Sequence, residues 1–251
     1  MQPMQSQAPA PAQAAQAGQF GPLIEEFTAS TLANTIYGLV LLVFAAGGLA
    51  LFISDKSNNL IFAVIGLIFL IIAAYLLVTS ALNSRNKVQV FRDGLVVVRG
   101  AQSQAIPWNA ITAFYQRIVR TRQSFVITSM SYRFTIELAD GKRYVFSQYK
   151  NVGRLGEILR QETTARQLPG ARAAYQAGQT LTFGKMSLSQ VGLSNGRETI
   201  PWGEVSGIQV ANGAIIISRQ GKRLAWASPL VPNVPNFVVF VTLAQEHAGA
   251  R

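Results

Sequence analysis

The sequence predicts a membrane helical hairpin followed by an α+β part. Two observations predict the hairpin: residues 35–53 and 60–82 are apolar and uncharged, and only six polar residues, 54–59, separate them. At about 1.5 Å per residue, each run is long enough for a hydrocarbon core of about 30 Å. A third observation predicts the α+β part, because short β-branched and aromatic runs alternate with turn signals beyond residue 83.

The composition of the two apolar runs favours a membrane over a protein core. A helix pair in a soluble protein keeps one polar face, and neither run has one. Small residues occur in both runs, which fits either close packing of the two helices or ordinary membrane composition. They are Ala45, Ala46, Gly47, Gly48 and Ala50 in the first run, and Ala63, Gly66, Ala73 and Ala74 in the second.

Charges next to the hairpin predict its orientation. Arg85 and Lys87 follow the second run, whereas the intervening turn carries only Lys56. Because basic flanks stay on the cytoplasmic side, we expect a multi-pass protein of the cell membrane with both termini in the cytoplasm.

The residues before the first apolar run divide into two parts. Residues 1–22 are mostly Gln, Ala and Pro, which cannot bury enough apolar surface to fold, so we predict a disordered tail. Glu25 and Glu26 are typical of a helix start, so the hairpin region is assigned to residues 23–84.

The α+β part contains an internal repeat. A Gly-Leu pair, an Ile-Pro-Trp triplet and a Gly-Lys-Arg triplet each occur twice in the same order. Proline lacks a ladder donor, so we expect it at a strand end or sheet edge, and we expect each tryptophan in a core rather than on a ligand platform. The marker residues are Gly94, Trp108 and Gly141 in the first copy, and Gly192, Trp202 and Gly221 in the second.

Each copy closes with a predicted helix. Residues 151–164 end the first copy, a second short helix at 169–176 belongs to a linker, and residues 234–247 end the chain. The first copy is also longer between its tryptophan and its Gly-Lys-Arg triplet, where we predict three strands at 111–119, 125–129 and 132–138. The resulting domains are 86–164, a helical linker at 165–177, and 178–248.

These motifs resemble the bacterial pleckstrin-homology-like (PH-like) domains of small membrane proteins. The layout is also similar to an uncharacterised family with a two-helix hairpin followed by tandem PH-like domains. The resemblance covers roughly residues 86–248. It implies that each copy is a small barrel or bent sheet of seven strands, capped by its C-terminal helix, although the second copy looks abbreviated.

The sequence offers no set of catalytic or metal-binding residues. His247 is the one histidine, cysteine is absent, and the acidic residues beyond the hairpin are scattered. Gly184-Lys185 does not begin a phosphate-binding loop, since Gln179 and Met186 occupy positions that need Gly and Ser or Thr. We therefore expect no enzyme, no cofactor and no metal.

The basic surplus is concentrated after the hairpin. The formal net charge is +11, and 21 Lys and Arg face 8 Asp and Glu from residue 83 onward. Anionic lipid and an acidic protein partner fit this charge, as does a simple topology signal, whereas nucleic acid is not expected without a recognised motif. The candidate contact residues are Arg85, Lys87, Arg117, Arg120 and Arg122.

These observations predict a non-catalytic binding or scaffold module for protein partners or anionic lipid, held at the bilayer by the hairpin. The alternative is a structural subunit that uses the hairpin itself to contact another membrane protein.

Overall fold

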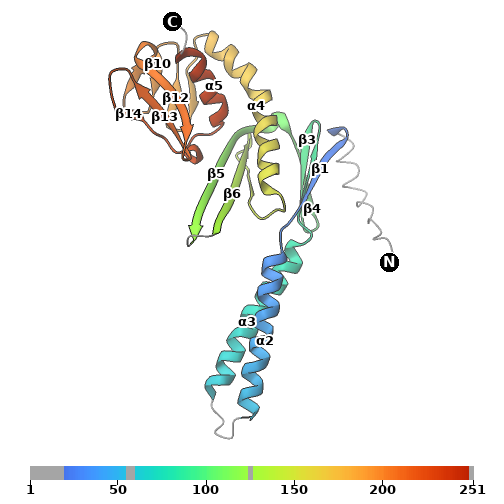
Figure 1. Cartoon of the computed structure of the whole chain (residues 1–251). Helices are drawn as coiled ribbons and strands as arrows, with labels where there is room; N and C mark the ends of the chain where they lie inside the picture. Colours follow the sequence, from blue (N-terminus) through green and yellow to red (C-terminus); the bar gives the residue numbers. More distant parts are fainter. Residues whose placement is uncertain (1–19, 55–59, 124–126, 249–251) are drawn as a thin grey trace. The chain divides into compact units, whose positions relative to one another are not determined.

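The computed structural model describes residues 20–54, 60–123 and 127–248, with the side chains of 120–123 and 127–129 left aside (Figure 1). Most of the predicted tail and the predicted polar turn between the helices lie outside these residues. The chain divides into two compact units. The first holds the residues up to Ile106 with Gln148–Lys150, and the second holds Pro107–Ser147 and the residues from Asn151 onward.

Helices α2 (Leu32–Ser54) and α3 (Leu60–Asn83) form the hairpin in the first unit. Both are long and apolar enough to cross a membrane, with mean hydropathy 2.5 and 3.1. In the most apolar 18-residue stretch of each helix, only 11% of the residues are buried. A Cβ atom on Gly48 would lie 3.1 Å from the Cα of Gly66, so the two backbones touch there. Gly48 and Gly66 therefore serve the pairing of α2 with α3, whereas Ala46, Gly47, Ala50 and Ala74 are exposed.

Residues 23–28 form a strand, which corrects the predicted helix start. Strand β1 (Leu23–Thr28) precedes the hairpin and pairs antiparallel with β2 (Lys87–Phe91), which follows it. Its partner β2 follows both helices in the sequence, so the strand could not be predicted from neighbouring residues. Both ends of the hairpin consequently meet at one sheet (Figure 1).

The first unit completes this sheet with β3 (Gly94–Arg99) and β4 (Gln102–Pro107), in the order β1-β2-β3-β4. Phe20 is buried against this sheet, with its ring centroid 6.5 Å from that of Phe91. The predicted disordered tail therefore extends too far, since Phe20 is already part of a core.

The second unit begins with a three-stranded sheet and a long helix. Strands β5 (Ile111–Gln123) and β6 (Ile127–Leu138) are continuous where three shorter strands were predicted, and β7 (Arg143–Phe146) completes the sheet. Helix α4 (Val152–Gln176) packs on one face, where a Cβ atom on Gly156 would lie 2.0 Å from the Phe134 ring.

Helix α4 runs through Pro169, so the predicted separation into helices at 151–164 and 169–176 is wrong. Leu168, Ala171 and Tyr175 pack against the core of the second copy. This packing compensates for the hydrogen bond that proline removes from the helix.

The second copy encloses one hydrophobic core between two open sheets and its final helix, α5 (Phe237–Ala248). Leu188 and Leu193 from one sheet, Ile215 from the other, and Phe240 and Leu243 from α5 are fully buried. The sheets are β8 (Leu181–Phe183), β9 (Met186–Leu188), β10 (Gly192–Ser194) and β11 (Thr199–Pro201), and then β12 (Val205–Ala211), β13 (Ala214–Arg219) and β14 (Ala225–Ala227).

The order of elements repeats along the chain. The first copy takes β1 from before the hairpin, outside the predicted residues 86–164. With β1 included, each copy has a four-stranded sheet followed by a short 3-10 helix, a three-stranded sheet and an α-helix, so the second copy is not abbreviated in strand number. The 3-10 helices are η2 (Trp108–Ala110) and η3 (Trp202–Glu204). All described sheets are open, so the barrel implied by the resemblance is not formed.

The repeated glycines have a steric role. A Cβ atom on Gly94 would lie 2.6 Å from the carbonyl oxygen of Ile106, and one on Gly192 would lie 2.0 Å from that of Ile200. The Gly-Leu and Ile-Pro-Trp motifs therefore recur together because the glycine, which lacks a Cβ atom, lets the isoleucine of the Ile-Pro-Trp motif approach its backbone closely. Gly141 and Gly221 adopt φ of 79° and 70°, as turn glycines do.

The repeated prolines and tryptophans fit the predictions in part. Pro107 and Pro201 are the last residues of the edge strands β4 and β11, as predicted. Trp108 is 2% exposed, but Trp202 is only half-buried and donates from Nε1 to the carbonyl oxygen of Ser189 at 2.8 Å. The prediction of two equally buried tryptophans is therefore wrong for Trp202.

Candidate anion-binding site

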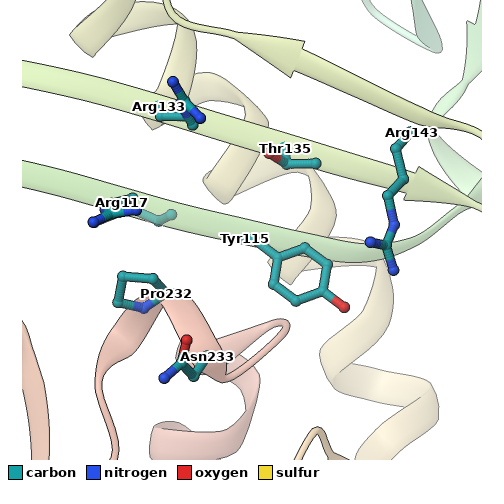
Figure 2. A pocket seen from close by; sticks show the side chains of 8 residues that line it. Tyr115, Arg117, Arg133, Thr135, Arg143, Pro232 and Asn233 are labelled. Atoms are coloured by element: carbon teal, nitrogen blue, oxygen red, sulfur yellow. The ribbon is translucent and has the colours of Figure 1, made fainter.

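A hollow of about 310 Å³ lies in the second unit, on the face of the β5–β7 sheet opposite α4. Side chains alternate along a strand, so Phe134 faces α4 while its neighbours Arg133 and Thr135 face the other way. Figure 2 shows Arg117 and Arg133 on neighbouring strands, with the 3-10 helix η4 (Val231–Asn233) beside them. The hollow is lined by Tyr115, Gln116, Arg117, Arg133, Thr135, Arg143, Pro232 and Asn233.

Two of the lining arginines form an unusual cross-strand pair. Arg117 on β5 lies directly opposite Arg133 on β6, and both are exposed. Like charges in directly opposed positions destabilise a sheet. Within the described part of the chain neither guanidinium has an acidic partner, so no described carboxylate offsets the repulsion.

The third arginine is already paired. Arg143 Nη2 lies 2.8 Å from Glu137 Oε2, and its Nε donates to the same oxygen at 2.9 Å. Burial raises the pKa of Tyr115, and the nearby Glu137 carboxylate raises it further. Because Glu137 is matched by Arg143, two positive charges at the hollow are left for a ligand.

Asn236, just before α5, fixes the second copy to the sheet that holds these arginines. Its Oδ1 accepts from the Phe114 amide, its own amide donates to the Phe114 carbonyl, and its Nδ2 donates to the Thr112 carbonyl, each at 2.8 Å. Its φ of 51° is a conformation that asparagine adopts more readily than most residues. The wall formed by Pro232 and Asn233 is thereby held next to β5.

The structure distributes the predicted contact residues over both units. In the hairpin unit, Arg85 lies exposed between α3 and β2, and Lys87 pairs with Glu26 of β1 at 3.3 Å. In the other unit, Arg117 lines the hollow, whereas Arg120 and Arg122 lie farther along β5 and their side chains are outside the description. Arg117 lies within β5, in the part of that strand that was predicted at 111–119.

Sequence reasoning missed Arg133 and gave no role in binding to Arg143. Arg133 lies in the predicted strand at 132–138, and Arg143 is the last residue of the first Gly-Lys-Arg triplet. A single hairpin centred near residue 125 would have placed Arg133 opposite Arg117, but the division into three strands hid this register.

The side chains that line the hollow are suited to binding an anion. Guanidinium groups bind carboxylates and phosphates through paired hydrogen bonds. Among the described residues, no three His, Asp or Glu side chains gather as a metal site would require. His247 stacks on Tyr175 with ring centroids 4.1 Å apart, away from the hollow's lining residues.

Comparison with known proteins gives one match. A protein-family model described as "Family of unknown function (DUF6585)" matches residues 1–250. No curated protein and no solved structure matches the chain.

Proposed function

The chain belongs to the DUF6585 family, and we propose that it is a two-pass membrane protein whose cytoplasmic tandem PH-like module binds anionic lipid head groups without catalysis. One observation carries this proposal. Arg117 and Arg133 are held side by side at a hollow with no acidic partner in the described structure, which favours an external anion.

The repeat supports the PH-like assignment. When β1 is counted with the first copy, both copies contain seven strands and a terminal helix, which are the elements that the resemblance implies. The pairing of β1 with β2 supports a shared side for the two hairpin ends, and Arg85 after α3 favours the cytoplasmic side.

Tethering makes a weak site sufficient. An exposed arginine near an anionic leaflet contributes only about 1 kcal/mol. The hairpin keeps the module at a high effective concentration near lipid, so two such contacts suffice for occupancy. The alternative, an assembly subunit, gains no support from Gly48 and Gly66, since these two residues face each other within the hairpin.

The experiment is lipid retention by the full chain. We would purify it in mild detergent, add phosphatidylglycerol or phosphatidylcholine, and count bound lipids by native mass spectrometry. The parent should prefer phosphatidylglycerol. The variant R117Q/R133Q should lose about 2 kcal/mol, or roughly 30-fold in affinity, for the anionic lipid only.

A charge-matched control is the variant R197Q/R223Q, which removes two exposed arginines outside the hollow. It should retain phosphatidylglycerol like the parent. Equal retention by the parent and R117Q/R133Q would contradict the proposal and leave the basic surplus as a topology signal.

A further inference from the structure

We propose that the open outer edge of β5 docks an extended acidic segment of a partner protein, which adds to the sheet as a further strand. This inference goes beyond lipid binding, because it rests on the backbone of β5 and on a second hollow. Strand β5 is 13 residues long and ends the order β5-β6-β7, so β6 covers only one of its two sides.

The first part of this outer edge is already used. Asn236 exchanges two hydrogen bonds with the backbone of Phe114 and donates a third to Thr112, all at 2.8 Å. Gln167 of α4 donates to the carbonyl of Ile111 at 2.9 Å. The protein thus completes the edge from Ile111 to Phe114 with groups that imitate a neighbouring strand.

Beyond Phe114 the edge is open. In an antiparallel sheet the outward-pointing backbone groups belong to every second residue. Because Phe114 points outward to Asn236, Gln116 and Ile118 point the same way. In the part of the chain that the structure describes, their outward amides and carbonyls have no assigned hydrogen bond. An exposed edge of this kind is a template for another strand.

A second hollow, of about 720 Å³, lies along this open edge. Ile118 and Val119 line it from β5, and Val210, Leu230 and Phe237 line it from the second copy. Ile118, Val119, Val210 and Leu230 are 41–54% exposed, which is high for large apolar side chains gathered in one place. An added strand would cover them with alternate side chains.

The positive charge beside the open edge of β5 indicates which kind of segment would bind there. Arg117 lines both hollows, so a segment along β5 would meet its guanidinium and the neighbouring Arg133. The chain's own residues 1–19 contain no Asp or Glu, so they lack the complementary charge. A second copy pairing through β5 would bring two Arg117 residues together. The fitting occupant is therefore a partner segment that alternates carboxylates with apolar residues.

The experiment uses the full chain in detergent and three fluorescent decapeptides. The first alternates Glu with Val, the second alternates Lys with Val, and the third is the Glu-Val peptide with every backbone amide methylated. Anisotropy measures binding, and hydrogen exchange measures protection of the β5 amides. We expect only the first peptide to bind and to slow exchange at Gln116 and Ile118.

Two variants of Ile118 separate backbone from side chain. Ile118→Pro removes the outward amide at a position where an edge strand tolerates proline, and Ile118→Ala keeps that amide. Ile118→Pro should weaken binding by about tenfold relative to Ile118→Ala, as the loss of hydrogen bonding predicts. Far-UV circular dichroism checks that both variants are folded.

Equal binding of the methylated peptide, or unchanged exchange at Gln116 and Ile118, would overturn the added strand. If Ile118→Pro fails to fold, the methylated peptide still decides the matter on the parent protein. Phosphatidylglycerol retention should be unchanged in Ile118→Ala. Failure of strand addition is therefore distinguishable from failure of lipid binding.

Discussion

The central hairpin of the first copy differs from its counterpart in the second chiefly in length. Strands β5 and β6 have 13 and 12 residues, whereas β12 and β13 have 7 and 6. Both hairpins begin after an Ile-Pro-Trp motif, and both shift register at the same place, between Ile111 and Ala113 and between Val205 and Gly207. The two hairpins therefore share their first residues, and the hairpin of the first copy continues for about six more residues in each strand.

The two hairpins also differ in whether their arginines have acidic partners. In the second copy the hairpin turns at Asn212 and Gly213, just after Ala211, which stands where Arg117 stands in the first copy. The second copy's Arg219 is neutralised by Glu198 at 3.1 Å and Glu204 at 2.6 Å. Arg219 in the shorter hairpin thus has acidic partners, whereas Arg117 and Arg133 in the longer one have none among the described residues.

The largest expected difference between the copies concerns their tryptophans. Trp108→Ala should cost about 3–5 kcal/mol of unfolding free energy, because it empties a fully buried site. Trp202→Ala should cost roughly half as much, since the indole is only half-buried. Denaturant unfolding of the full chain in detergent measures both, and equal losses would show that the two tryptophans are equivalent after all.

The next prediction tests the steric role that the copies share. Gly94→Ala and Gly192→Ala should each cost about 1–3 kcal/mol, with Gly192→Ala the worse, because a Cβ atom collides with a backbone carbonyl in each copy. Gly170→Ala in α4 is the matched control, as its Cβ atom meets nothing within 4 Å. The control should gain about 0.5–1 kcal/mol. Thermal melts that rank all three alike would refute the close approach.

The smallest expected effect concerns the helices that end the two copies. Arg172 of α4 donates from Nε to Glu246 of α5 at 3.2 Å and holds the pKa of that carboxyl below its usual value of 4.5. A lowered pKa in the folded state stabilises above pH 4.5, and this stability is lost as the pH falls through the folded value. Glu246→Gln should therefore melt slightly below the parent at pH 7 and together with it at pH 3. A pH-independent difference would exclude the ion pair as its cause.

Local patterns predicted much of the fold. The two apolar helices follow from uncharged runs, and the turn at Gly141 follows from its glycine, because both signals lie within a few residues. Strand β1 was missed because its partner follows the whole hairpin. The break expected at Pro169 was wrong because tertiary packing of Leu168 and Tyr175 outweighs the local penalty.

The candidate site was harder to predict from the sequence than the fold was. Arg117 was identified from the local density of charge, but its significance depends on Arg133, and their opposition depends on hairpin register. The wall of the hollow comes from Pro232 and Asn233, about 100 residues farther along the chain than Arg133. Only the positioning of the second copy through Asn236 brings that segment to β5.

The pairing of β1 with β2 also fixes an order of events during biosynthesis. Thr28 leaves the ribosome well before its partner Lys87, and residues 29–86 must be translated in between. At roughly 5–20 residues per second, this interval lasts about 3–12 s. Glu25 and Glu26 place charges on the waiting strand, which guards its unpaired edge against wrong partners. The first sheet therefore forms only after both apolar helices have been synthesised.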